Sequence, residues 1–191
     1  MASTLQAASG GRFTLGIGIG GNVAEHAAYG IGFPEKPERA ARLEEAILTM
    51  RALWTGGPVT RASPYYPLVE AHAFPVPEPA PKILVGAASP AGLRIAARVG
   101  DGWAAEIDDF ERLLPTYLEA LAVNGRTRAD AWIAVGFGSG RTGEDALTGS
   151  PWIAAPRETW ERYAAAGADE AIVTARTPND VDALVGAADR W

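Results

Sequence analysis

A turn of small residues in the middle of the chain has the chemistry of an anion site. Residues 86–91 read Gly-Ala-Ala-Ser-Pro-Ala and follow the apolar run Ile83–Val85. Small side chains let a phosphate approach the backbone, and the Ser89 hydroxyl adds a donor. Pro90 suits the first position of a helix, whose free N–H groups and positive end favour an anion. The sequence therefore predicts a phosphate-binding turn, in which Ser89 either contacts the phosphate or serves only as the helix N-cap.

A glycine-rich segment nearer the N-terminus is the second candidate site. Gly16, Gly18 and Gly21 have the G-x-G-x-x-G spacing of a dinucleotide-binding loop and follow an apolar strand pattern. Such a loop must open a long helix and be followed by an acid at a strand end about 20 residues on. Gly30 and Pro34 leave room for only two helical turns here, which argues against a Rossmann-type, NAD(P)-binding dehydrogenase. The glycines then either let backbone segments approach closely or form a loop for a different cofactor.

Residue types that serve metal binding and nucleophilic catalysis are scarce. The chain has no cysteine and two histidines, His26 and His72, without carboxylates at ligand spacing. No metal site and no Ser-His-Asp arrangement is predicted. His26 is expected to be a surface or supporting residue rather than a base, and His72 a solvated loop residue. No catalytic residue is assigned from the sequence.

The composition limits the classes of partner. The chain has 17 basic and 23 acidic residues, a net charge of −6, and no cluster of Lys or Arg. A nucleic-acid surface needs such a cluster, so nucleic acid is excluded as a partner. The start lacks the pattern of a signal peptide, and glycine, proline and charges interrupt every apolar run well short of the ~18 residues of a membrane span. We expect a cytoplasmic protein that acts on a small-molecule substrate, with no membrane partner.

Short apolar runs alternate with helical patterns along the chain. Strands are predicted over 13–18, 83–85, 103–105, 132–137 and 170–174, and helices over 37–54, 90–99, 110–123, 156–166 and 178–191. Residues 58–81 are a Pro-rich excursion with one short hairpin near Tyr65-Tyr66, and residues 138–151 are a loop. The alternation predicts a parallel sheet with helices outside. Five βα units suit an open sheet, whereas a complete (β/α)8 barrel needs eight units and typically ~250 residues.

Several segments carry a family pattern in order over nearly the whole chain. They are Gly11–Asn22, Arg42–Ala46, Arg51–Gly56, Pro81–Pro90, Ala96–Trp103 and Ala165–Val173. Together they resemble the bacterial luciferase-like family of flavin-dependent oxidoreductases, whose members are (β/α)8 barrels that bind FMN or the deazaflavin coenzyme F-420 (F420). The resemblance implies an α/β fold, a partial TIM barrel of about five βα units that correspond to strands 4–8. It also implies a single luciferase-like domain over 1–191 that lacks the first three units and carries 58–81 as an insertion.

The resemblance assigns roles to both candidate loops and to one strand end. The turn after the fifth barrel strand holds the cofactor phosphate in the family, residues 19–22 would line the ring pocket, and Trp103 would border the cofactor. Gly21 stands where many members carry a Trp or a Glu, so the acid that some deazaflavin enzymes use is not expected here. The predicted cofactor-binding residues are Ile19, Gly20, Gly21, Asn22, Gly86, Ala87, Ala88, Ser89, Pro90, Ala91 and Trp103.

The implied function is that of a luciferase-like oxidoreductase or monooxygenase that transfers hydride between F420 or FMN and a small organic substrate. F420 is favoured because residues 18–22 contain no cationic side chain and because the Ala-, Gly- and Arg-rich composition is typical of genomes that use F420. The main alternative is a truncated, non-catalytic cofactor-binding remnant, since groups near the reacting carbon often come from strands 1–3 in the family. Unpaired edges of the first and last strands would favour a homo-oligomer.

Overall fold

The computed structural model describes residues 1–136, 147 and 149–191 and contains a sheet of five parallel strands. The strands lie in the order β1 (Thr14–Gly18), β4 (Lys82–Gly86), β5 (Gly102–Glu106), β6 (Trp132–Gly136) and β7 (Glu170–Ile172). Each strand pairs in parallel with the next one along this order. Within the described residues β1 and β7 each pair on one side only, so the sheet is an open arc built from the five predicted units.

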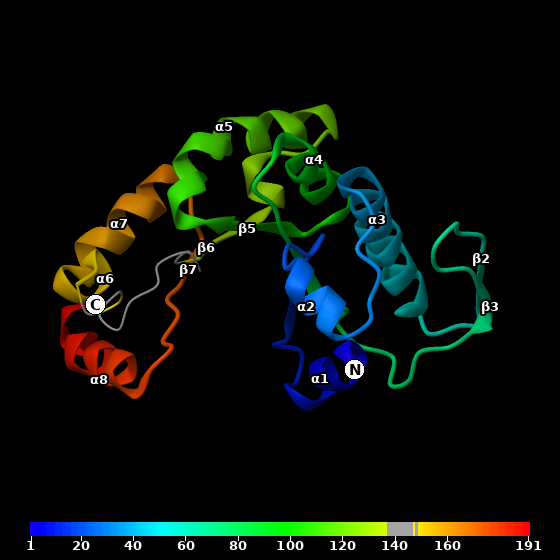
Figure 1. Ribbon diagram of the computed structural model, residues 1–191, viewed down its shortest axis with the longest axis horizontal. Helices are drawn as coiled ribbons and strands as arrows, with labels where there is room; N and C mark the ends of the chain where they lie inside the picture. Colours follow the sequence, from blue (N-terminus) through cyan, green and yellow to red (C-terminus); the bar gives the residue numbers. More distant parts are fainter. Residues whose placement is uncertain (137–146, 148) are drawn as a thin grey trace.

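Helices cover the outer side of this arc. They are α3 (Lys36–Leu53), α4 (Pro90–Val99), α5 (Ile107–Val123) and α7 (Pro156–Ala166), which follow β1, β4, β5 and β6. Figure 1 shows these helices along the convex side of an arch that has β5 in its middle. The remaining helices are α1 (Ala2–Ala8), α2 (Val23–Ala28), α6 (Pro151–Ala154), α8 (Pro178–Ala187) and two 3-10 turns, Arg128–Asp130 and Ala188–Arg190.

The hydrophobic core lies between the sheet and these outer helices. Alternate strand residues enter it, namely Ile83, Val85, Trp103, Ala105, Ile133 and Val135. Successive side chains of a strand point to opposite faces. Gly86, Ala104 and Gly136 therefore face the concave side, which carries small residues toward the carboxyl ends of the strands.

The Pro-rich excursion folds as predicted around one hairpin. Strands β2 (Val59–Arg61) and β3 (Leu68–Ala71) pair antiparallel, and Tyr65-Tyr66 lies in their connection. In Figure 1 this hairpin lies at one end of the arch, beyond α3. No helix in the described part of the chain is long and apolar enough to cross a bilayer.

The structure corrects the bounds of several predicted elements, among them β7, which ends at Ile172 rather than at residue 174. Helix α5 begins at Ile107 rather than at residue 110, and α8 ends at Ala187 rather than at the C-terminal Trp191. Pro151 begins α6 instead of belonging to a loop, because the next residue, Trp152, is buried and stacks on Tyr163 with ring centroids 5.8 Å apart. Position 137 of the predicted strand and most of the predicted loop 138–151 fall outside the described residues.

Candidate functional site

The register of two strands brings both predicted loops to one edge of the sheet. Gly18 of β1 pairs with Gly86 of β4, so residues 19–22 and 86–91 leave the sheet side by side at the carboxyl ends of the strands. A methyl group added at Gly18 would lie 3.4 Å from the carbonyl oxygen of Gly86, so the two strand ends are close together. Parallel α/β folds bind their ligands at this edge.

The turn 86–91 is compact because the next helix begins directly against it. Ser89 is the N-cap of α4, and its Oγ accepts the Gly92 N–H at 3.4 Å. A methyl group at Gly92 would approach the Cβ of Ala87 to 2.9 Å, so glycine is required there. A hydroxyl donates as well as accepts, so the N-cap role leaves the Ser89 proton available to a ligand. The N-cap role is thus observed, and the phosphate contact stays a prediction.

Trp103 supports the turn 86–91 from the helix side of the sheet, and its side chain does not face the concave side. Its side chain is fully buried and packs against Phe110 and Tyr117 of α5, with ring centroids 6.0 and 5.2 Å away. Its Nε1–H donates to the carbonyl oxygen of Ala87 at 2.8 Å. Burial beside this indole raises the pKa of Tyr117 to about 12. Strand alternation turns the side chain toward the helices, and the direct contact of Trp103 with a cofactor stays a prediction.

An arginine that the sequence reasoning missed holds the other loop. Arg39 of α3 donates its Nη1–H to the carbonyl oxygens of Gly20 and Ile19 (3.5 Å for the latter) and its Nε–H to Pro34 O at 3.0 Å. Its guanidinium carbon lies 4.0 Å from the centroid of the Phe33 ring. A cation therefore lies behind residues 19–22, although none of residues 18–22 carries a cationic side chain. Arg39 belongs to α3, outside the loop, so the sequence of residues 18–22 alone does not reveal it.

Gly20 and the neighbouring helix give the loop a fixed shape. Gly20 has φ +74°, and a methyl group there would lie 3.0 Å from His26 Cε1. The Asn22 side chain caps α2 by accepting the Glu25 N–H at 3.1 Å, and its backbone carbonyl lies 2.9 Å from His26 Nδ1. His26 thus has the supporting place expected of it, while His72 is exposed in the Pro-rich segment.

The two ends of the concave face differ in chemistry. Toward the amino ends of the strands, Lys82 Nζ lies 5.0 Å from the centroid of the Trp132 ring, and Trp132 Nε1–H donates to Glu170 at 3.0 Å. Toward the carboxyl ends, β1, β4, β5 and β6 carry small residues on this face apart from the exposed carboxylate of Glu106, which pairs in register with Gly136. Ile172 of β7 pairs with Gly136 on its other side and is also exposed. The sequence reasoning missed Glu106, because no local motif distinguishes it from a carboxylate at the start of a helix. The described residues contain no group of three metal-ligating side chains.

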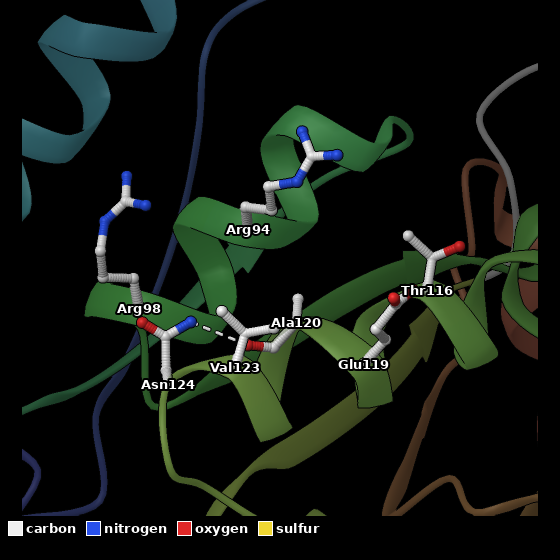
Figure 2. Close-up of a pocket in the computed structure, with 7 residues that line it drawn as sticks. All are labelled: Arg94, Arg98, Thr116, Glu119, Ala120, Val123 and Asn124. Carbon is white, nitrogen blue, oxygen red and sulfur yellow. Dashed lines mark hydrogen bonds between the residues drawn. The ribbon is translucent and has the colours of Figure 1, made fainter.

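One of the hollows on the described surface adjoins the site, and another lies behind the sheet. A crevice of about 240 Å³ beside the loop is lined in part by Ile17, Ile19, Leu43 and Tyr66. The groove drawn in Figure 2 lies between α4 and α5 on the outer side of the sheet, away from the strand ends. Its Arg98 is already paired with Glu44 of α3 at 2.6 Å, so no ligand site is assigned there.

Comparison with known proteins identifies relatives with redox cofactors. The chain is 38% identical over 125 residues to an F420-dependent glucose-6-phosphate dehydrogenase from Microbacterium testaceum, an alignment that covers 63% of this chain and 37% of that relative. An F420-dependent secondary alcohol dehydrogenase, solved with an F420–acetone adduct, superposes on this chain with a TM-score of 0.76 and 17% sequence identity. The superposition covers 96% of this chain and 70% of the dehydrogenase chain. The F420-dependent tetrahydromethanopterin reductase from Methanopyrus kandleri superposes with a TM-score of 0.69 at 19% identity, over 96% of this chain and 74% of its own.

These comparisons confirm the fold and the relationship inferred from the sequence. The chain spans little more than a third of the length of the curated relative it matches, and its open sheet corresponds to part of a TIM barrel. F420, the favoured cofactor, is the one named for these relatives. The model of the family described as luciferase-like monooxygenase matches residues 1–187. The chain therefore belongs to the luciferase-like monooxygenase family.

Proposed function

We propose that the chain binds F420 across its two adjacent loops and takes part in hydride transfer to or from a small alcohol or carbonyl compound. The observation that carries this proposal is the pairing of Gly18 with Gly86, which sets loops 19–22 and 86–91 side by side. A phosphate site and a ring site must be neighbours if one cofactor is to occupy both.

The turn 86–91 fits the phosphate end of such a cofactor. Ala88, Pro90 and Ala91 are exposed and small, and α4 begins directly behind them. The backbone N–H groups of the first helical turn and the Ser89 hydroxyl would donate to phosphate oxygens. The hydrogen bond from Trp103 to Ala87 O keeps the turn in place while a ligand binds.

The concave side of the sheet fits the planar ring. Gly18, Gly86, Ala104 and Gly136 place no large side chain at this edge, so a flat ring system can lie close to the strands. The cofactor, when bound, supplies the hydride chemistry, and the protein binds, orients and shields it. Glu106 places a carboxylate at the same edge, where it would exchange a proton with a substrate hydroxyl. The named relatives that act on a sugar phosphate and a secondary alcohol support an alcohol or carbonyl substrate.

A second candidate function is cofactor binding without turnover. The open arc supports it, since β1 and β7 each keep one unpaired edge within the described residues and the concave side is not enclosed as it is in a closed barrel. The same free edges support self-association through strand pairing. The single-domain description of 1–191, the insertion at 58–81 and the cytoplasmic location stay predictions.

Titration with cofactors separates these functions. Purified protein is titrated with F420, FMN and NAD, and any bound deazaflavin is then assayed for single-turnover hydride transfer with a set of small alcohols. Binding of F420 followed by turnover supports the proposal, and binding without turnover supports the second function. Binding of NAD alone would overturn both.

A further inference from the structure

We propose that the backbone N–H groups of Gly20 and Gly21, held in position by Arg39, form a binding site for a negatively charged oxygen. The inference rests on the proposed function, because the oxygen it assigns is a carbonyl oxygen of the cofactor ring. It gives Arg39 the role of a positioning residue that acts through the backbone of the loop.

The direction of these two N–H groups follows from the hydrogen bonds of Arg39. Its guanidinium binds the carbonyl oxygens of Ile19 and Gly20, which belong to two successive peptide units. In a trans peptide unit the C=O and the N–H that follows it point in opposite directions. The N–H groups of Gly20 and Gly21 therefore both point away from the guanidinium, and so away from α3, which carries it. Adjacent backbone donors that point the same way form a nest for anions.

Both donors are unused and accessible. Gly20 and Gly21 are exposed, and within the described part of the chain neither N–H makes a hydrogen bond. Gly20 adopts φ +74°, which places the loop in a shape that other residues rarely take. Gly21 has no atom within 4 Å of the position of an added methyl group, so the space beside it is open.

The charge of Arg39 strengthens these donors. Within the described residues Arg39 forms no ion pair with a carboxylate, and its side-chain hydrogen bonds go to the carbonyl oxygens of Ile19, Gly20 and Pro34. A half-buried cation that binds two carbonyl oxygens polarises the peptide units to which they belong. The N–H ends of those units then favour an oxygen that carries negative charge over a neutral one.

The pyrimidine-dione ring shared by flavins and deazaflavins offers such an oxygen. Its carbonyl oxygens are conjugated with the ring, and they carry negative charge when the reduced ring is in its anionic form. The same loop lies beside the turn 86–91 that would hold the phosphate, so one cofactor reaches both. The site is thus expected to bind the reduced cofactor more tightly than the oxidised one.

The test follows the two amides directly by NMR. Protein labelled with 15N-glycine is titrated with oxidised and with reduced F420, and the amide signals of Gly20 and Gly21 are assigned with Gly→Ala variants. We expect both signals to shift on binding, with tighter binding of the reduced form. Arg39→Gln should reduce these shifts and weaken binding of the reduced form about tenfold, the effect of losing charge-assisted hydrogen bonds.

Two variants separate the site from general effects. Arg94→Gln removes the same charge from the outer side of α4 and should leave affinity and both amide signals unchanged. Arg39→Lys keeps the charge but replaces the planar guanidinium fork with a compact ammonium group, so its affinity should fall between those of the wild type and Arg39→Gln. The shifts of the Gly20 and Gly21 amide signals in the wild-type protein test the site without any variant, so the experiment still decides if Arg39→Gln fails to fold. The inference is overturned if F420 binds and neither amide signal moves, or if Arg39→Gln binds reduced F420 as the wild type does. Failure of the wild type to bind F420 at all overturns the proposed function, and the inference with it.

Discussion

Replacement of Trp103 by phenylalanine tests whether its indole holds the phosphate turn. The indole Nε1–H donates to Ala87 O at 2.8 Å and is fully buried. Phenylalanine keeps the aromatic packing against α5 but cannot donate this hydrogen bond. Ala87 is half-buried, and one such hydrogen bond contributes about 0.5–1.5 kcal/mol, so the variant is expected to lose that much stability in addition to its packing loss.

Trp152 provides a matched control for the packing loss. It is 1% exposed and stacks between Tyr163 and Trp191, but its Nε1–H has no hydrogen-bond partner within the described residues. Trp152→Phe therefore removes similar volume without removing a hydrogen bond, so the bond to Ala87 contributes only to the loss in Trp103→Phe.

The assay is urea denaturation followed by circular dichroism, combined with F420 titration. Trp103→Phe should lower the free energy of unfolding by about 0.5–1.5 kcal/mol more than Trp152→Phe, and it alone should weaken F420 binding. Equal stability losses together with equal F420 affinities for the two variants would refute the role given to the indole of Trp103.

Three further predictions follow from single residues. Gly20→Ala should destabilise the protein by about 1–2 kcal/mol because of its positive φ and the approach to His26, whereas Gly21→Ala should be close to neutral in thermal unfolding. Burial raises the pKa of Tyr117 to about 12, so the hydroxyl loses its proton at a lower pH in the unfolded chain than in the folded protein. The free energy of unfolding should therefore fall as the pH rises above about 10. Tyr117→Phe should remove this part of the decline in urea denaturation at alkaline pH. Hydrogen bonds from backbone N–H groups just before α8 lower the pKa of Asp180. Its carboxylate therefore stabilises the fold fully at pH values above the ordinary aspartate pKa. This stabilisation is lost as the pH falls through the lowered pKa. Asp180→Asn should flatten the acid side of the stability profile, and an unchanged profile would contradict the assignment.

Much of the fold could be predicted because its signals are local. The alternation of apolar runs such as Ile83–Val85 with amphipathic helical patterns predicts β4, α4 and the parallel sheet, and Ser89-Pro90 marks the start of α4 correctly. The neighbouring position of the two loops also follows from sequence order, because consecutive βα units usually lie side by side.

The remaining features depend on contacts between distant segments. Arg39 reaches loop 19–22 from another element, so a reading of that loop finds no cation in it. Trp103 lies in a strand, and the strand pattern does not say which of the two faces of the sheet its side chain joins. Its packing against α5 decides that the side chain is buried on the helix side. Glu106 occupies the concave edge for the same reason, and no local motif distinguishes it from a helix-start carboxylate.

Hydrogen–deuterium exchange with and without F420 tests the central claim that the two loops form one cofactor site. The account predicts that peptides covering 19–22 and 86–91 become protected together at the same F420 concentration, while peptides over the outer helix surface at Arg94 and Arg98 do not change. Protection of one loop without the other, or of neither, would contradict it.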